Sequence, residues 1–343
     1  MVLVKMKSFT KGDIYLAESV FKTYFGEEKK ENDMYNSEIV IIGAAIIDVL
    51  VRPVSARVFE TGSYPAEDIH MTTGADALNE ATILAHMNRK VQLETVIGKD
   101  DAGSFIQNHL QSSGIYVRKN CVKETEKTGM NVVLVGADGT RSFLTNPNGT
   151  LRSLRIDDIE MPFPESAKII CFASIFVFPK IGPDELTRIF KKAKSQGKIV
   201  CADMTKRKKN ETLQDMAEAF SYIDYLLPND EEAMLLTGAD SVEEAAELLK
   251  RTGVGNVIIK CGKRGCYIRT DVEKYWIQAE QNVNCIDTTG AGDSFAAGFL
   301  NALLDGKSVD ECAKEGNQCG AKSVQYVGAT EWLKMEINIT DCR

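Results

Sequence analysis

The sequence lacks most features that would place the chain among zinc-binding, disulfide-bonded or membrane-spanning proteins. Its three histidines do not stand at zinc-ligand spacing, so we expect no structural zinc. Its nine cysteines include no Cys-x-x-Cys pair and several lie inside apolar runs, which predicts reduced thiols and a cytoplasmic location. Apolar runs all fall short of the ~20 residues of a membrane helix, so we expect no membrane partner.

The sequence also lacks an excess of positive charge. Lys and Arg number 41 against 49 Asp and Glu, which gives a formal net charge of −8. The cluster of Lys and Arg within residues 204–210 is expected to be a solvated loop. Nucleic acids are therefore not expected partners. What remains is an ordinary globular composition, 44% hydrophobic over 343 residues, which fits one large α/β domain with an appendage or two domains.

A glycine-rich turn, Asp287-Thr-Thr-Gly-Ala-Gly-Asp293, leads directly into an apolar helix. Glycines let backbone N–H groups point inward together, and a helix N-terminus adds partial positive charge. Gly290, Ala291 and Gly292 are therefore candidates for an anion-binding cradle. A carboxylate beside an anion cradle repels bound phosphate, so its presence there indicates a chemical role. Asp293 is therefore a candidate general base that accepts a proton from an attacking hydroxyl. The alternative is a simple helix cap.

Buried strands alternate with helices elsewhere. Glu38–Asp48 predicts one fully buried strand that ends at a carboxylate, and residues 168–203 continue the strand–helix–strand pattern of an α/β fold. Ligands in such folds bind beyond the carboxyl ends of strands, so Asp48 is a candidate for binding hydroxyl groups. A turn carboxylate is the alternative. Asp138-Gly139 between two β-rich runs predicts a hairpin.

The stretch Asp287–Asp293 resembles the C-terminal signature of the PfkB/ribokinase family of carbohydrate and nucleoside kinases, and similar motifs cover roughly residues 38–330. This resemblance implies an α/β fold of the ribokinase-like type. Such a fold has three layers (α/β/α), a mainly parallel central sheet and a small β-sheet lid, here formed by about residues 49–72 and 128–145.

The resemblance also implies the domain organisation. It places the kinase domain at residues 37–335. Residues 1–36 are expected to be a peripheral N-terminal extension without a catalytic role, and residues 336–343 a C-terminal tail.

Met71–Ala81 is similar to the family's substrate-binding signature. Gly74 would allow a sugar to approach closely, and the Asn79 amide offers a donor and an acceptor to a pair of hydroxyls. Ala75 and Asp76 depart from the family pattern, which often has Gly followed by Lys, Ser or Asn. An acid at position 76 favours a polyol over a phosphorylated substrate. The candidate substrate-binding residues are Asp48, Gly74, Ala75, Asp76, Asn79, Arg141 and Asn146, with a plain exposed strand residue as the alternative for Arg141.

Three further motifs resemble the family's nucleotide site. Asn229 and Glu232 resemble the pair near the ATP phosphates and Mg²⁺, with Glu232 binding Mg²⁺ through water, although the same pair forms a capping-box pattern. Lys260 stands where the family often has a small hydroxyl residue, and it reaches either a phosphate or solvent. The candidate nucleotide-binding residues are Asn229, Glu232, Lys260, Gly262, Gly265 and Asn317, the last at the adenine edge.

Asp287 and Thr289 resemble the ligands of a monovalent cation, K⁺, that some members bind beside the anion cradle. The cofactors implied by the resemblance are thus ATP and Mg²⁺, with K⁺ as a further candidate.

The resemblance implies an ATP-dependent phosphotransferase acting on a hydroxyl of a sugar or sugar acid. The alternative is a nucleoside kinase, for which Phe176 and Phe178 would supply an aromatic platform; a remoter one is a scaffold protein that has lost catalysis. No Gly-x-Gly-x-x-Gly follows the first strand, which argues against a dehydrogenase. We expect a homodimer formed through the lid, because a small sheet exposed on one side leaves edges and apolar surface to cover.

Overall fold

A computed structural model describes residues 36–138 and 140–334. The predicted N-terminal extension, Asn36 excepted, and the predicted C-terminal tail lie outside these residues.

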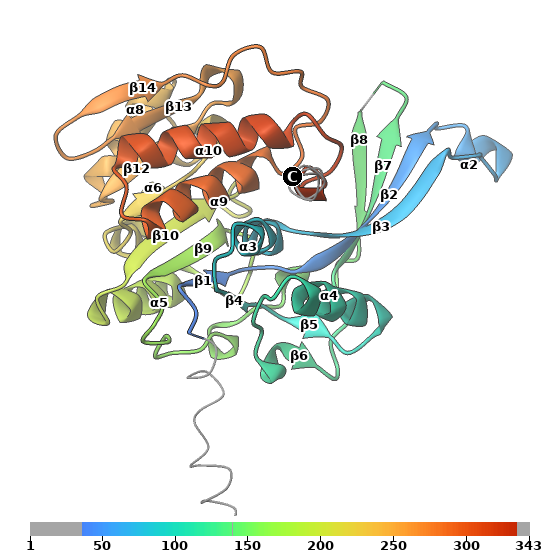
Figure 1. The fold of residues 1–343 in the computed structure, drawn as a ribbon, viewed down its shortest axis with the longest axis horizontal. Coiled ribbons are helices and arrows are strands. Elements are labelled where there is room, and N and C mark those ends of the chain that lie inside the picture. Colours follow the sequence, from blue (N-terminus) through green and yellow to red (C-terminus); the bar gives the residue numbers. More distant parts are fainter. Residues whose placement is uncertain (1–35, 139, 335–343) are drawn as a thin grey trace, which may run out of the picture. The chain divides into compact units, whose positions relative to one another are not determined.

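An eight-stranded sheet, in the order β14-β13-β12-β11-β10-β9-β1-β4, forms the centre of the fold (Figure 1). Strands β4, β1, β9, β10, β11 and β12 pair in parallel, and β13 and β14 add an antiparallel edge. The predicted mainly parallel sheet is confirmed. Its strands are β1 (Ile39–Ile42), β4 (Val91–Glu94), β9 (Ile169–Ile175), β10 (Ile199–Met204), β11 (Tyr225–Leu226), β12 (Asn256–Lys260), β13 (Cys266–Arg269) and β14 (Lys274–Ile277).

Helices cover both faces of this sheet, so the predicted three layers are confirmed. Alternate residues of β1 enter two separate apolar cores, Ile39 and Ile41 one, Val40 and Ile42 the other. This alternation follows from the two-residue period of a strand. The first core contains residues of α3 (Asp76–His86), α4 (Asp101–Ser112), α9 (Ala291–Leu304) and α10 (Val309–Ser323), and the second contains residues of α5 (Pro183–Ser195), α6 (Leu213–Phe220), α7 (Asp230–Thr237) and α8 (Val242–Arg251).

A second, four-stranded sheet, called the lid sheet here, has the order β3-β2-β7-β8 and extends away from the central sheet (Figure 1). Pairing is parallel between β2 and β7 and antiparallel elsewhere, and both predicted lid segments contribute strands. The bounds are β2 (Ile46–Val54), β3 (Asp68–Gly74), β7 (Met130–Gly136) and β8 (Arg141–Thr145), with the short helix α2 (Val58–Thr61) between β2 and β3; β5 (Ile97–Gly98) and β6 (Val122–Lys123) form a small separate sheet.

The register of the lid sheet separates polar from apolar side chains. One cross-strand row is polar and the adjacent row, on the opposite face, is apolar. The polar row is Thr72, Asp48, Asn131 and Thr145; the apolar row is Met71, Val49, Val132 and Leu144.

The prediction of one strand over Glu38–Asp48 is wrong. The chain leaves the central sheet at Gly43 and enters the lid sheet at Ile46. The reason is a close approach: a Cβ atom at Gly43 would lie 2.6 Å from Cβ of Ala77 in α3, so the backbone turns under that helix. As a result Asp48 belongs to the lid sheet and not to the central sheet.

Within the described parts of the chain, none of the helices combines the length and apolar character that a membrane crossing requires. The eight cysteines described there are free, and all except Cys285 are buried.

Candidate active site

The N-terminus of α9 forms an anion cradle, by which we mean the backbone of Gly290–Asp293. Gly290 caps the helix with φ 71°, and a Cβ atom there would lie 2.5 Å from Cβ of Ala329, so only glycine fits. Within residues 36–138 and 140–334, no acceptor binds the N–H groups of Gly290, Gly292 and Asp293, whereas Ala291 N–H donates to Thr288 at 3.2 Å. These N–H groups and the helix dipole favour an anion.

Asp293 is the third residue of α9 and connects it to α3. Nδ2 of Asn79 donates to Oδ2 of Asp293 at 2.7 Å. Burial and then the Asp76 carboxylate raise the pKa of Asp293 to about 7, against the opposing effects of Asn79 and Lys260. A carboxyl group whose pKa lies near neutral pH is suited to accept a proton there.

The lid sheet supplies a second carboxylate, Asp48. Its Oδ1 accepts a hydrogen bond from Asn131 at 3.0 Å, and Asn131 in turn accepts one from Thr145 at 2.7 Å. Gly74 lies directly beneath, since a Cβ atom there would stand 2.1 Å from Oδ2 of Asp48. Burial raises the pKa of Asp48, Asn131 lowers it, and Asp76 raises it further. The Asp76 carboxylate therefore raises the pKa of both Asp48 and Asp293.

A buried ion pair lies behind the cradle. The Lys260 ammonium, at the end of β12, donates to Asp203 at the end of β10, and their side chains are only 13% and 8% exposed. A Cβ atom at Gly292 would stand 3.5 Å from Nζ of Lys260, so this cation adjoins the cradle. Burial alone would lower the pKa of Lys260, but Asp203 and Glu232 raise it, so the side chain carries a positive charge at neutral pH.

Asn229 and Glu232 form the capping box at the start of α7. Glu232 N–H donates to Oδ1 of Asn229, and Asn229 N–H donates to Oε2 of Glu232, each at 2.9 Å. The helix-cap alternative thus holds, and Oε1 of Glu232 is not committed to the box. Asn229 also pairs with Lys260 in a parallel bridge, which brings the box beside the Lys260 ion pair.

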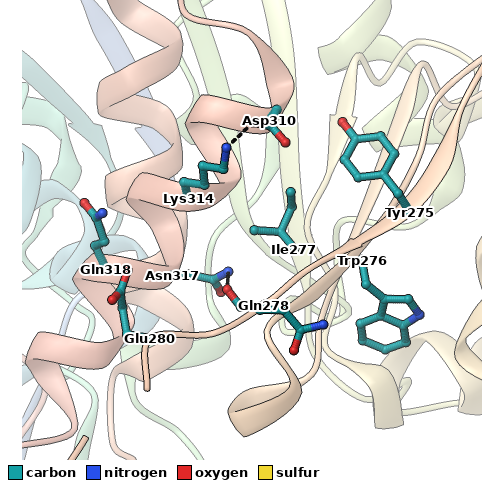
Figure 2. A pocket seen from close by; sticks show the side chains of 9 residues that line it. All are labelled: Tyr275, Trp276, Ile277, Gln278, Glu280, Asp310, Lys314, Asn317 and Gln318. Carbon is teal, nitrogen blue, oxygen red and sulfur yellow. Dashed lines mark hydrogen bonds and ion pairs between the residues drawn. The ribbon is translucent and has the colours of Figure 1, made fainter. Parts of the chain in front are cut away.

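A cavity of about 520 Å³ lies between α10 and β14 (Figure 2). On one wall Nδ2 of Asn317 donates to the backbone carbonyl of Gln278 at 3.2 Å, as the dashed line in Figure 2 shows. Gly265 abuts the same wall, since a Cβ atom there would lie 2.0 Å from the carbonyl of Ile277. The loop Gly262–Gly265 therefore leads from Lys260 toward this cavity.

Other candidate residues are directed elsewhere. The Asn146 amide binds backbone groups of Met130 and Thr128, so it holds the turn after β8. The Arg141 guanidinium pairs with Asp287 at 2.5 Å. Phe178 is 3% exposed and packs edge-to-face on Phe172, so it belongs to the core and offers no platform for a base.

The sequence interpretation missed four polar partners, although a signal existed for two of them. Asp203 lies one residue before the end of the buried strand β10, and a carboxylate at a strand end is the argument that selected Asp48. Asn131 alternates with apolar neighbours in β7. Ser174, which donates to Asp76, and Glu80 had no local signal. Glu80 is fully buried, and burial followed by the Asp203 carboxylate raises its pKa well above the ordinary value.

Comparison with known proteins decides the family. The model of the family described as "pfkB family carbohydrate kinase" matches residues 36–335 of this chain. The chain belongs to this family. Members are phosphotransferases with an alcohol group as acceptor, and the expected enzyme class is thereby confirmed, as is the ribokinase-like fold.

Individual relatives of the family are distant. The 2-dehydro-3-deoxygluconokinase of Haemophilus influenzae is 26% identical over 79% of this chain and 91% of that protein. The cytidine kinase of Thermococcus kodakarensis is 28% identical over 81% and 93%. A solved structure of Arabidopsis thaliana ribokinase, complexed with ribose and ATP, superimposes with a TM-score of 0.70 at 23% identity and covers 88% of this chain and 98% of that one.

Proposed function

We propose that the protein transfers the terminal phosphoryl group of ATP to a hydroxyl of a neutral sugar or polyol, with Asp293 as general base. The observation that carries this proposal is the hydrogen bond from Asn79 to Asp293. This hydrogen bond joins α3, which faces Asp48 and the lid sheet, to α9, whose N-terminus carries the anion cradle. Asp293 therefore stands between a hydroxyl-binding side and a phosphate-binding side, as a base for phosphoryl transfer must.

The N–H groups of Gly290, Ala291 and Gly292, supplemented by Lys260, are proposed to stabilise the charge that develops on the transferred group. Donors that are already oriented need no rearrangement when this charge appears. The N–H of Ala291 is partly committed to Thr288, so the two glycines and Asp293 N–H carry most of this role.

ATP is proposed to run from Lys260 along Gly262–Gly265 to the cavity beside Asn317, which would meet the adenine edge. Mg²⁺ would be held by Glu232 through water, near Asn229, and would neutralise phosphate charge. The chemistry of Glu232 fits, because Oε1 is a hard oxygen donor outside the capping box. Among the described residues no group of three or more His, Cys, Asp and Glu is arranged to hold a metal, and a hydrated Mg²⁺ on phosphates needs none.

The charges around the acceptor side favour a neutral substrate. Asp48 and Asp76 present carboxylates there, with Ala75 and Gly74 forming the backbone between β3 and α3. Arg141, the cation that would meet an anionic substrate, is paired with Asp287. An acidic sugar would therefore be repelled without a counter-charge. Because one relative is a 2-dehydro-3-deoxygluconokinase, 2-dehydro-3-deoxygluconate is a suitable anionic acceptor for a test.

The test is an ADP-release assay with ATP and three groups of acceptors: neutral sugars and polyols, the corresponding sugar acids, and nucleosides. We expect the best neutral acceptor to exceed its acid counterpart in kcat/KM by at least about tenfold, because each carboxylate repels the acid. Turnover confined to nucleosides or to acids would contradict the acceptor class. Absence of ADP release with every acceptor would contradict the kinase function itself.

Gly74→Ala is expected to raise KM for the acceptor about 10- to 100-fold, because the new methyl group must displace the Asp48 carboxylate, and a hydrogen bond to a charged group contributes about 1.5–3 kcal/mol. KM for ATP should stay within a few-fold. The measurement is steady-state kinetics with each substrate varied in turn. Gly182→Ala is the control, since Gly182 has an ordinary φ of −94° and a Cβ atom there would make only a van der Waals contact, 3.4 Å from Oε2 of Glu185. An equal change in both KM values for Gly74→Ala would indicate general damage instead.

Ala75→Gly is expected to stabilise the fold. Ala75 has φ 79° and ψ 148°, a backbone region that costs a non-glycine residue about 1–3 kcal/mol. After the extra flexibility of an unfolded glycine is subtracted, a gain of about 1 kcal/mol remains. Urea unfolding of the parent and the variant measures this gain in the free energy of unfolding. Asn88→Gly is the control, because Asn tolerates its left-handed φ of 63°. No gain at position 75 would show that the surroundings remove the strain.

We also propose a homodimer formed through the apolar face of the lid sheet, which is opposite the face that carries Asp48. Ile69, Met71 and Leu144 lie on that face and are 66%, 45% and 59% exposed. Large apolar side chains exposed together favour association. Light scattering at micromolar concentration should give twice the chain mass, and Met71→Glu with Leu144→Glu should give the monomer. A monomeric parent protein would rule the proposal out.

A further inference from the structure

The lid sheet contacts the loop that leads into the anion cradle through one ion pair. Arg141 is the first residue of β8, and its Nη2 lies 2.5 Å from Oδ2 of Asp287. The two side chains are 22% and 6% exposed, so the pair is shielded from water. The turn Asp287–Gly290 leads directly into α9, whose third residue is the base Asp293.

Asp287 has no acceptor capacity left. Its Oδ1 accepts from N–H and Oγ1 of Thr289, at 3.0 and 2.9 Å. Its Oδ2 accepts from N–H of Gly328 at 2.8 Å and from Arg141. A carboxylate offers about four lone-pair positions, and all are engaged here.

These contacts do not fit a monovalent cation at Asp287 and Thr289. A cation bound there needs lone pairs of the carboxylate, yet the guanidinium already provides one positive charge to it. Oγ1 of Thr289 is turned toward Asp287 as a donor. The residues that the family resemblance assigns to K⁺ therefore form a closed set of hydrogen bonds with a cationic side chain.

The same carboxylate ties three segments together. N–H groups of Ile286 and Asp287 donate to the carbonyl of Val324, at 2.7 and 3.1 Å, which holds the loop to the end of α10. Gly328 binds the carboxylate directly, and the following residue, Ala329, packs on Gly290. A charge that neutralises Asp287 thereby stabilises the turn that orients the cradle.

We propose that Arg141 takes the place of a monovalent cation at Asp287, so that the lid sheet itself completes the anion cradle and the enzyme needs no K⁺. This inference rests on the proposed kinase function for its kinetic part. Lid position and cradle order become coupled, because the charge that stabilises the loop arrives on a lid strand. A guanidinium with fixed planar donors suits this role, since it orients the carboxylate as well as neutralising it.

The test compares KCl with choline chloride at equal ionic strength, by thermal unfolding and by ADP release. The parent protein should show the same unfolding midpoint and kcat within about twofold in both salts. Arg141→Ala should lose about 10- to 100-fold in kcat in choline chloride, as expected when a charge-assisted hydrogen bond is removed. KCl should restore most of that loss and raise the unfolding midpoint of this variant.

Two further variants sharpen the comparison. Arg52→Ala removes a lid arginine that pairs with Asp68 at 3.1 Å, away from Asp287, and should behave like the parent in both salts. Arg141→Lys keeps the charge and should remain insensitive to K⁺, which guards against a folding failure of Arg141→Ala.

Activation of the parent by K⁺, or an Arg141→Ala variant as active as the parent, would overturn the proposal. A loss that no monovalent cation restores would also overturn it, because Arg141 would then act on the lid alone. The unfolding midpoints keep this test separate from the proposed function. They report on cation binding even if no acceptor is ever phosphorylated.

Discussion

Asp293→Asn is expected to lower kcat by about 10²- to 10⁴-fold, the usual cost of removing a general base. Asparagine has nearly the same size, and its carbonyl oxygen can still accept the hydrogen bond from Asn79. What it cannot do is take a proton from the attacking hydroxyl. The loss should therefore fall on kcat, while the dissociation constant for ATP stays within a few-fold, since the cradle is made of backbone N–H groups.

The pH profile provides an independent test of the same group. The base must be deprotonated to act, and burial raises the pKa of Asp293 to about 7. In the parent enzyme kcat/KM should therefore rise about tenfold per pH unit below pH 7 and level off above it. The residual activity of Asp293→Asn should lack this rise.

Asp101→Asn is the matched control for Asp293→Asn, because Asp101 is an exposed aspartate in the first turn of α4. It should leave kcat and the pH profile unchanged. A kcat for Asp293→Asn within a few-fold of the parent value would reduce Asp293 to a helix cap and refute the mechanism.

Lys260→Met should have the largest combined effect on stability and activity. It leaves the Asp203 carboxylate buried without its partner, and removing one member of a buried ion pair costs about 3–5 kcal/mol of unfolding free energy. It also removes the cation beside Gly292, so we expect weaker ATP binding and a lower kcat. Burial raises the pKa of Asp203, and the variant can take up a proton there, which should make the stability loss smaller at low pH.

A double variant separates the two effects. Lys260→Met with Asp203→Leu replaces the ion pair by apolar side chains and should recover most of the stability, because such replacements are often neutral or stabilising. It should not recover ATP binding or turnover. The measurements are urea unfolding and ATP titration calorimetry on the single and double variants.

Lys99→Met provides the control, since Lys99 pairs with Glu124 in an ion pair whose side chains are 62% and 74% exposed. Exposed pairs contribute little, and this variant should unfold like the parent. Recovery of ATP binding together with stability in the double variant would show that Lys260 is needed only for folding.

The sequence determined the features that depend on neighbours in the chain. The glycine turn at Gly290 and the apolar helix behind it follow from local residue preferences, and so does the alternation of buried strands and helices. The hairpin of β7 and β8 also follows, because its turn residues are local. The same local patterns misplaced the end of the first strand, since nothing within Glu38–Asp48 reports that Ala77 packs on Gly43.

The partnerships at the candidate site depended on tertiary structure. Asn79 and Asp293 are 214 residues apart, Asp48 and Asn131 are 83 apart, and Lys260 and Asp203 are 57 apart. These pairs meet only because the strand order and the lid pairing bring the ends of distant strands and helices together, and no local preference encodes such an order. The partner of Arg141 was decided in the same way: its sequence context permits solvent, substrate or phosphate, and the fold directs it to Asp287.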